Sequence, residues 1–456
     1  MKIVSAAEAV AHIRDGSTIT TGGGVGIGFP ELVVKALGTS GKKDLTLFHA
    51  AGQGDGKDRG LNHLATPGLL KRVIGGHWGL APKLQALANT NAIEAYNLPQ
   101  GVASHLFRDI AAHRPGHLTT IGINTFIDPI LGGGRLNAIT TEDIVQNVTI
   151  NGKECLFYPA FPIDVALIRA TTSDKAGNLT MEGEALTMDT LSQAMAARNS
   201  GGIVIAQVRN IREANVARSA HVPAHLVDYV VVCDKLSDHP FTFGSNESHR
   251  AKNHDNPSHQ EMLIARRALQ ESKAGDVVNV GIGLAGYVVT AAGLQNQVTF
   301  TTESGATGGV PLNGLNFGAS AFNRSVVDQG YQFDFYDGGG IDVAFLGFAE
   351  IDRHGNVNVS RFKNRIAGAG GFINITQRAK KIVFCGTMLS SKGEKKFVNS
   401  VEQVTFRADN QRDILCVTDK AVFRLSEGDV RLDEVFVGVS ASQVLDNMEF
   451  IPVKLS

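Results

Sequence analysis

Cysteine is scarce in this 456-residue chain, and its four cysteines are widely separated. No two of them have the C-x-x-C spacing of a zinc site, and so few in so long a chain give no disulfide framework. We therefore expect reduced thiols in a cytoplasmic protein that holds no metal. The four residues are Cys155, Cys233, Cys385 and Cys416.

The chain also lacks an excess of charge of either sign and any long hydrophobic run. It has 43 Lys and Arg against 44 Asp and Glu, so the basic patches that bind nucleic acid or anionic membranes are not expected. Residues 277–302 carry no charge, but Gly, Asn, Gln and Thr interrupt them, which argues against a membrane span. Glu8 and Asp15 break the apolar core that a signal peptide would need.

Glycine, in contrast, is abundant. The 51 glycines are roughly 11% of the chain against a usual level of about 7%, and they indicate many tight turns and close backbone approaches. The length favours two domains, because single cores usually stop growing near about 250–300 residues. With 43% hydrophobic residues, the chain has enough apolar material to fill both cores.

An internal repeat gives the organisation of the chain. Residues 163–178 and 341–356 both begin Ile-Asp-Val-Ala and both end Asp-x-x-Gly-Asn, at an offset of 178 positions. Residues 201–208 and 380–387 follow at nearly the same offset, and both are apolar runs rich in β-branched residues. Such runs are typical of buried parallel strands.

The beginnings of the two halves match as well. Ser5-x-x-Glu8 and Ser258-x-x-Glu261 are capping boxes that open amphipathic helices. In each half a strand, a glycine-rich turn, a helical pattern and a second strand follow. The sequence therefore predicts an α/β fold of two tandem homologous open domains, with mainly parallel sheets and the active site between them.

We place the first domain at residues 1–240, a linker at 241–258 and the second domain at 259–456. The linker is polar and has no hydrophobic periodicity. The first domain carries about 75 additional residues within 53–162, and these include a predicted hairpin whose type I′ turn is Asn151-Gly152.

The most informative difference between the halves lies where their second strands end. Alignment of these strands sets Ala50 opposite Glu303. Ligands of open α/β sheets bind outside the carboxyl ends of strands, and a glycine-rich run after Glu303 leaves room for a substrate. Glu303 is therefore a candidate catalytic carboxylate, although a solvated strand-end residue would show the same pattern.

A competing interpretation concerns the same segment. Gly281-x-Gly283-x-x-Gly286 follows a predicted strand and opens a helix, and Glu303 lies 22 residues after the first glycine. This is the layout of a dinucleotide-binding fingerprint, in which the acid binds the ribose. The equivalent glycine run of the first half does not fit the pattern. On pattern alone, the two interpretations of Glu303 stay open.

Other candidates carry weaker signals. The glycine-rich segment 367–372 has several backbone N–H groups for an anion, and Gln100 has an amide donor suited to polarising a carbonyl. An ordinary turn and a surface glutamine are the alternatives. The histidine pair with i, i+4 spacing has Pro223 between its members, which argues against a metal-binding helix. The histidines in question are His221 and His225, and further ones at or beside the linker are His249, His254 and His259.

Several motifs together resemble the class I coenzyme A transferases. They are Thr302-Glu303-Ser304-Gly305 with Gly308-Gly309, YNLPQG at 96–101, the segment 336–362, GAGGFINI at 368–375, GGHWGL at 75–80 and NTFIDP at 124–129. The resemblance covers nearly the whole chain. It is greatest to the single-chain acetate or propionate CoA-transferase branch, in which both halves are fused.

The resemblance implies roles for particular residues. Glu303 matches the family's nucleophile and Gln100 its carbonyl-contacting glutamine, and the following glycine Gly305 is retained. Gly368, Gly370 and Gly371 match a loop that approaches the thioester. Basic side chains after the repeat are candidates for holding CoA phosphates, although a solvated strand end would also carry them; they are Arg361, Lys363 and Arg365.

The implied reaction moves CoA between a short-chain acyl-CoA and a free carboxylic acid by ping-pong chemistry through Glu303. Acetate and propionate are the expected acids, and 3-oxoacids are an alternative. CoA and acyl-CoA are then substrates, no cofactor is bound, and the chain is expected to form a homo-oligomer. Two rival activities remain: an acyl-CoA hydrolase on the same scaffold, and a dinucleotide-dependent oxidoreductase that uses Gly281-x-Gly283-x-x-Gly286.

Overall fold

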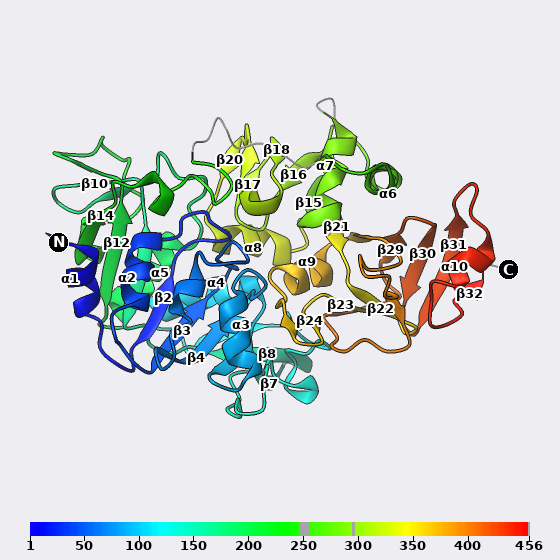
Figure 1. Cartoon of the computed structure of the whole chain (residues 1–456), viewed down its shortest axis with the longest axis horizontal. Coiled ribbons are helices and arrows are strands. Elements are labelled where there is room, and N and C mark those ends of the chain that lie inside the picture. The colour runs from blue at the N-terminus through cyan, green and yellow to red at the C-terminus, as the bar shows by residue number, and fades with distance from the viewer. Residues whose placement is uncertain (247–255, 294–296, 455–456) are drawn as a thin grey trace.

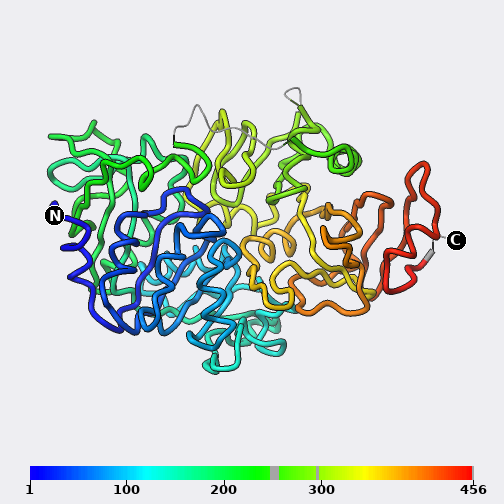
Figure 2. The backbone as a smooth tube through the Cα atoms, viewed as in Figure 1, coloured from blue at the N-terminus to red at the C-terminus, as the bar shows by residue number. Residues whose placement is uncertain are grey.

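A computed structural model of the chain describes residues 1–246, 256–293 and 297–454. Half of the predicted linker, residues 247–255 with His249 and His254, lies outside the described residues. The two termini lie at opposite ends of the long axis (Figure 1). Figure 2 shows the first half, blue to green, at one end and the C-terminal part, orange to red, at the other. Among the described residues, no helix is long and apolar enough to cross a membrane.

The first half is built on one sheet of eight strands, and every neighbouring pair in it is parallel. Its strands, in spatial order, are β1 (Lys2–Ile3), β14 (Tyr229–Val232), β12 (Ile203–Val208), β9 (Val165–Arg169), β2 (Thr18–Thr21), β3 (Leu45–His49), β4 (Leu70–Gly75) and β5 (Glu94–Asn97). Every residue of β9 is buried, as expected for a strand covered on both faces.

The second half is built on a sheet of ten strands. In spatial order they are β20 (Ser325–Val326), β17 (Ala306–Thr307), β16 (Thr299–Thr301), β15 (Val277–Val280), β21 (Val343–Gly347), β26 (Lys381–Cys385), β29 (Asp413–Val417), β30 (Ala421–Ser426), β31 (Asp429–Val435) and β32 (Val453–Lys454). The five strands from β16 to β29 are parallel. Their order repeats that of β3, β2, β9, β12 and β14, which confirms the tandem α/β fold.

Helices cover the sheets on both sides. Those of the first half are α1 (Ala6–Ala11), α2 (Glu31–Gly38), α3 (Pro82–Asn89), α4 (Gln100–Ala111) and α5 (Thr190–Asn199). Those of the second are α6 (His259–Leu269), α7 (Tyr287–Ala292), α8 (Gln329–Asp337), α9 (Phe372–Arg378) and α10 (Ala441–Leu445). The two predicted capping boxes, at Ser5 and Ser258, are confirmed.

The repeat is also visible in matching polar contacts. The Asp164 carboxylate accepts a hydrogen bond from the backbone N–H of Thr18 at 2.7 Å, and the Asp342 carboxylate accepts one from Val277 at 2.8 Å. Each contact ties the strand that begins with the shared Ile-Asp-Val-Ala motif to the first long strand of its own half. The shared motif is therefore structural.

Smaller elements complete each half. β10 (Thr172–Asp174), β11 (Leu179–Thr180) and β13 (Asn210–Arg212) form one sheet of the first half, and β22 (Glu350–Asp352), β23 (Asn356–Asn358), β27 (Phe397–Val398) and β28 (Phe406–Arg407) its counterpart in the second. Two hairpins of the second half are β18 (Val310–Pro311) with β19 (Ser320–Ala321), and β24 (Arg361–Phe362) with β25 (Arg365–Ile366). The 3₁₀ helices include η1 (Leu61–Leu64), η2 (Pro129–Leu131), η3 (Ala224–Leu226), η4 (Leu236–Asp238), η6 (Gly283–Gly286) and η7 (Gly314–Asn316).

The region predicted to carry additional residues, 53–162, widens the first half. Two of its strands, β4 and β5, extend the parallel sheet, and α3 and α4 cover them. It also contains a separate sheet of β6 (Gly116–Thr119), β8 (Lys153–Pro159) and β7 (Gln146–Ile150). The predicted turn joins β7 to β8, and positive φ angles at both Asn151 (50°) and Gly152 (75°) confirm its type I′ geometry.

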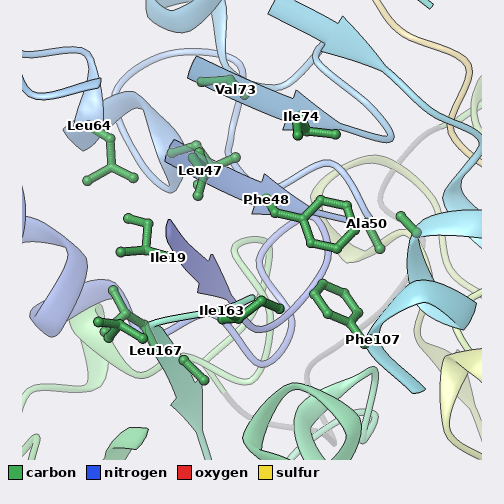
Figure 3. Close-up of a cluster of buried hydrophobic side chains, with 14 of the residues drawn as sticks. Ile19, Leu47, Phe48, Ala50, Leu64, Val73, Ile74, Phe107, Ile163 and Leu167 are labelled. Atoms are coloured by element: carbon green, nitrogen blue, oxygen red, sulfur yellow. The ribbon is translucent and has the colours of Figure 1, made fainter. Parts of the chain in front are cut away.

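The core of the first half is continuous with part of the second. Figure 3 shows buried side chains of β2, β3, β4, β9 and α4 meeting in this core, Ile19, Leu47 and Phe107 among them. Ile366, Ala369 and Ile373 of the second half belong to the same cluster. These three residues therefore pack into the core of the first half, whereas Phe372, in the same segment, packs into a core cluster of the second.

Candidate active site

Glu303 lies two residues beyond the carboxyl end of β16, in a tight turn. The N–H of Gly305 donates to the carbonyl oxygen of Thr302 at 3.0 Å, which closes the turn around Glu303. Gly305 has a φ of 107°, and a side-chain carbon there would lie 2.0 Å from the carbonyl oxygen of Val327. This position therefore requires glycine, and the glycine fixes where the Glu303 side chain starts.

A cavity of ≈ 410 Å³ lies between the two halves and contains Glu303 in its wall. Its walls are mostly apolar; the polar side chains among them are His77, Gln100, Glu303, Ser304 and Arg365. Four aromatic residues of the second half also line it: Phe317, Phe348, Phe362 and Phe372. This volume lies in the range of small-molecule sites, which are largely apolar with a few polar groups.

Backbone hydrogen bonds close the cavity from both halves. The carbonyl oxygen of Ala367 accepts from the N–H groups of Trp78, at 2.7 Å, and Gly79, at 2.8 Å. Gly370 donates to the carbonyl of Gly76 at 2.8 Å and accepts from the N–H of Gln100 at 2.9 Å. These bonds hold the glycine-rich loop of the second half against the first, and Asn89 at the end of α3 donates to the carbonyl of Asn364 between β24 and β25.

Burial raises the pKa of Glu303 from its ordinary value of 4.5 to about 7. Hydrogen bonds with its own backbone and with the Asn279 side chain lower it in part. Its Oε2 atom is buried and has no hydrogen-bond partner among the described residues. A carboxylate with an unpartnered oxygen beside a cavity is an expected feature of a reactive group, because a purely structural carboxylate would be paired.

Gln100 begins α4, directly after Pro99, and is 4% exposed. Its Nε2 donates to Oε1 of Gln329 at 3.0 Å, so one of its two amide hydrogens is held by the second half. A side-chain carbon on Gly370 would lie 3.6 Å from Oε1 of Gln100, and one on Gly371 would lie 3.4 Å from Cγ of Glu303. The structure thus brings Gln100 and Glu303, 203 positions apart in sequence, to adjacent glycines of one loop.

The backbone donors of that loop differ in availability. Gly368 donates its N–H to Ser360 at 2.9 Å, and Gly370 donates its N–H to Gly76. The N–H of Gly371, at the N-terminal end of α9, donates to no other described residue. Among the three glycines named from the sequence, Gly371 is therefore the one with a backbone donor to spare.

The three basic residues are not placed alike. Arg365 lines the cavity. The Lys363 side chain is 82% exposed and pairs with Glu394 at 2.6 Å, and Arg361 donates to the carbonyl of Leu136 at 2.7 Å and lies 3.5 Å from Glu402. Neither of these two lines the cavity. Their role in holding CoA phosphates stays a prediction, and Arg365 is the one nearest to the site.

Sequence reasoning singled out no histidine of the cavity wall, yet His77 lies there. Burial, with smaller contributions from His49 and Arg365, lowers the pKa of His77 to about 4, so the ring is neutral at physiological pH. Its Nδ1 atom is buried without a partner among the described residues. The available signal was its place inside the GGHWGL motif at 75–80, which was used only as part of the resemblance.

The other candidates are the glycines of the predicted dinucleotide-binding pattern and the histidines considered as metal ligands. Gly281 lines the cavity, and Gly283–Gly286 form the 3₁₀ helix η6 before the short helix α7. His221 lies 3.4 Å from Asp328. In the described part of the chain, no group of three or more His, Cys, Asp or Glu residues is arranged to hold a metal ion.

Comparison with known proteins decides the family. The family model of coenzyme A transferase matches residues 3–233. The chain is 40% identical to the acetate CoA-transferase YdiF of Escherichia coli O157:H7 over 99% of this chain and 92% of that protein. The chain belongs to the coenzyme A transferase family.

Further relatives agree. The caffeate CoA-transferase of Acetobacterium woodii is 39% identical over 99% of this chain and 94% of that protein. The crystal structure of the acyl-CoA transferase YdiF from E. coli O157:H7, in a thioester complex with CoA, matches with a TM-score of 0.91 at 38% identity, over 99% and 93% of the two chains. Family membership confirms the resemblance, the α/β fold and the prediction of an enzyme of the CoA-transferase type.

Proposed function

We propose that the protein transfers CoA between a short-chain acyl-CoA and a free carboxylic acid, with Glu303 as the covalent nucleophile. The observation that carries this proposal is the Glu303 carboxylate in the wall of the cavity, with one oxygen unpartnered among the described residues. Relatives named as acetate and caffeate CoA-transferases, and the YdiF crystal structure in a thioester complex with CoA, support it.

The first half-reaction begins with attack on the acyl-CoA thioester. An ionised Glu303 oxygen adds to the carbonyl carbon, the C–S bond breaks, and CoA leaves as a thiolate with the electron pair, which gives a mixed anhydride. The thiolate then adds to Cδ of Glu303. The anhydride C–O bond breaks, the first acid leaves as a carboxylate, and Glu303 carries CoA as a thioester.

The second half-reaction reverses these steps with another acid. The incoming carboxylate attacks Cδ of Glu303 and expels the thiolate, and the thiolate attacks the new acyl carbonyl. The products are the new acyl-CoA and the Glu303 carboxylate. Since each nucleophile is an anion and each leaving group departs as one, the cycle needs no net proton, no metal and no bound cofactor.

Each addition step places negative charge on a carbonyl oxygen. The second N–H of Gln100 Nε2 and the N–H of Gly371 are the donors that we assign to this oxyanion. One such donor typically contributes about 3–4 kcal/mol to transition-state stabilisation. The apolar rings around the cavity exclude water, which strengthens these hydrogen bonds and slows hydrolysis of the anhydride.

The acid preference follows from the size and chemistry of the cavity. It is mostly apolar, and the CoA arm must share its ≈ 410 Å³ with the acyl group. We therefore propose acetate or propionate as the acceptor, with larger apolar acids next. The homo-oligomer and the CoA-phosphate contacts predicted from the resemblance remain proposals.

The test is to follow CoA in a mixture of propionyl-CoA and excess acetate. A transferase converts propionyl-CoA to acetyl-CoA in equal amounts, without free thiol. A hydrolase would release free CoA whether or not acetate is present, and this result would contradict the proposal. Binding of NADH with a change in its fluorescence would instead favour the oxidoreductase.

A further inference from the structure

A buried carboxylate outside the cavity wall is connected to Gln100 through one side chain. Asp189 precedes α5 in the first half and is 4% exposed. Its Oδ2 accepts from Nε2 of Gln329 at 2.8 Å and from Oγ of Ser104 at 3.0 Å. Gln329 opens α8 in the second half, and its Oε1 accepts from Nε2 of Gln100. The hydrogen bonds thus cross from the first half to the second and back.

The ordinary reasons for an aspartate at this position do not explain Asp189. Aspartate before a helix usually caps it by accepting a hydrogen bond from the first turn, but the Asp189 side chain makes no capping bond. Its Oδ1 is buried without a partner among the described residues, and burial raises the pKa of Asp189 to about 7. A buried, incompletely paired carboxylate lowers stability, so its retention needs a reason other than packing.

The hydrogen-bond chemistry supplies that reason. An ionised carboxylate only accepts hydrogen bonds, so Gln329 must turn its nitrogen toward Asp189. The same nitrogen donates to Ser104 at 2.6 Å, which leaves Oε1 of Gln329 facing Gln100. That oxygen also only accepts, so Gln100 must present its nitrogen. One N–H of Gln100 is then anchored, and the direction of the other is fixed.

We propose that Asp189 is a positioning residue that acts through Gln329 to fix the orientation of the Gln100 amide at the reacting carbonyl. This inference rests on the proposed function, since it assumes that Gln100 stabilises an oxyanion. Asp189 itself does not line the cavity, and its side chain hydrogen-bonds to Ser104 and Gln329 but not to Glu303. Without the charge of Asp189, the amide group of Gln329 can flip, so that its Oε1 and Nε2 exchange places. Nothing then fixes which amide atom of Gln100 faces the cavity.

The test is a double-mutant cycle at about pH 8, where ionised Asp189 and Glu303 predominate because both pKa values are about 7. Asp189→Asn keeps the shape but lets Gln329 adopt either orientation. We expect kcat for CoA transfer to fall about tenfold, as for other residues that orient a reacting group, with KM for acyl-CoA unchanged within about twofold. In a Gln100→Ala background the same change should alter kcat by less than about twofold.

A matched control lies two residues away. The Thr187 hydroxyl donates to Asp328, another contact between the halves beside Gln329, but it makes no hydrogen bond to Asp189, Gln329 or Gln100. Thr187→Val should retain the wild-type kcat. If Asp189→Asn does not fold, Gln329→Leu gives the same test, because it removes the link itself and should show the same dependence on Gln100.

The outcomes separate the two proposals. Suppose that the wild type transfers CoA. If Asp189→Asn then lowers kcat equally in the wild-type and Gln100→Ala backgrounds, or lowers it in neither, the positioning role alone is overturned. A wild-type chain that transfers no CoA would overturn the proposed function and this inference with it. A loss confined to the background that retains Gln100 supports both.

Discussion

The two halves share the order of five parallel strands but differ in the residue that follows their second long strand. In the second half, β16 ends at a turn that presents Glu303 to the cavity. In the first half, β3 ends at His49, and the residue aligned with Glu303 is Ala50, which is 2% exposed. A side-chain carbon on the neighbouring Gly76 would lie 2.0 Å from the Ala50 carbonyl oxygen. Position 76 therefore requires glycine, and the first half has alanine where the second has the Glu303 carboxylate.

What the first half contributes instead is the opposing wall. Gln100 and the 76–79 segment contact the glycine-rich loop of the second half, and they do so from the region of additional residues, 53–162. In the proposed mechanism the two halves have different roles. The second half supplies the proposed nucleophile, and the first supplies the proposed oxyanion donor and one wall of the cavity; we call this the division of roles.

The largest effect expected from this division is at Glu303. Glu303→Ala removes the only group to which the proposal assigns a covalent bond, so transfer should fall by at least about a thousandfold while the fold is kept. Coupled assay of acetyl-CoA formation measures the loss, and circular dichroism checks the fold. Ala50→Gly at the equivalent position is the control, with activity within about twofold. A folded Glu303→Ala enzyme with a tenth of wild-type transfer would contradict the division.

The next effect is at Gln100. Gln100→Ala removes one donor to the oxyanion, and we expect kcat to fall by roughly a hundredfold, the usual loss for one such group. Steady-state kinetics with both substrates varied measures it. An unchanged kcat would exclude Gln100 as a donor to the oxyanion and would leave the first half only a structural role at the cavity.

A smaller effect concerns pH. Glu303 must be ionised to attack, and burial raises its pKa to about 7. kcat/KM for acyl-CoA should therefore decrease about tenfold per pH unit below that value and level off above it. Asp189 also has a pKa of about 7, so Asp189→Asn is the control, and it should keep this pH limb. A flat profile from pH 5 to 8 would exclude Glu303 as the titrating nucleophile.

Much of this arrangement is present in the sequence. The repeated Ile-Asp-Val-Ala motif predicted equivalent strands, and β9 and β21 are those strands. The contrast of Ala50 with Glu303 identified the differing position without any structure. The amide donor of Gln100 made it only a weak candidate, and the role proposed for it came from the family motif around it.

Other features depended on three-dimensional contacts. Asp189 and Gln329 are 140 positions apart, and no local pattern links them to Gln100. Lys363 pairs with Glu394, 31 positions away, and the spacing of the basic residues at 361, 363 and 365 gives no indication of this pair. The place of His77 in the cavity wall and its lowered pKa both depend on burial, which cannot be predicted from the motif alone.

The smallest effect expected is on stability. Gly305→Ala introduces a clash with the Val327 carbonyl and an unfavourable φ, so the free energy of unfolding should fall by about 2–4 kcal/mol. Gly41, with a φ of 74° and open space around it, is the matched control, and Gly41→Ala should cost only about 1–2 kcal/mol. Urea denaturation compares the two. Equal losses would mean that the Glu303 turn tolerates a side chain.

The most direct measurement is the intact mass of the protein after it is mixed with acyl-CoA in the absence of an acceptor acid, followed by peptide mapping. The account predicts a gain equal to CoA less one water, located on the peptide that contains Glu303 and absent from Glu303→Ala. An enzyme that transfers CoA rapidly but carries no such adduct, or carries it on another residue, would contradict it.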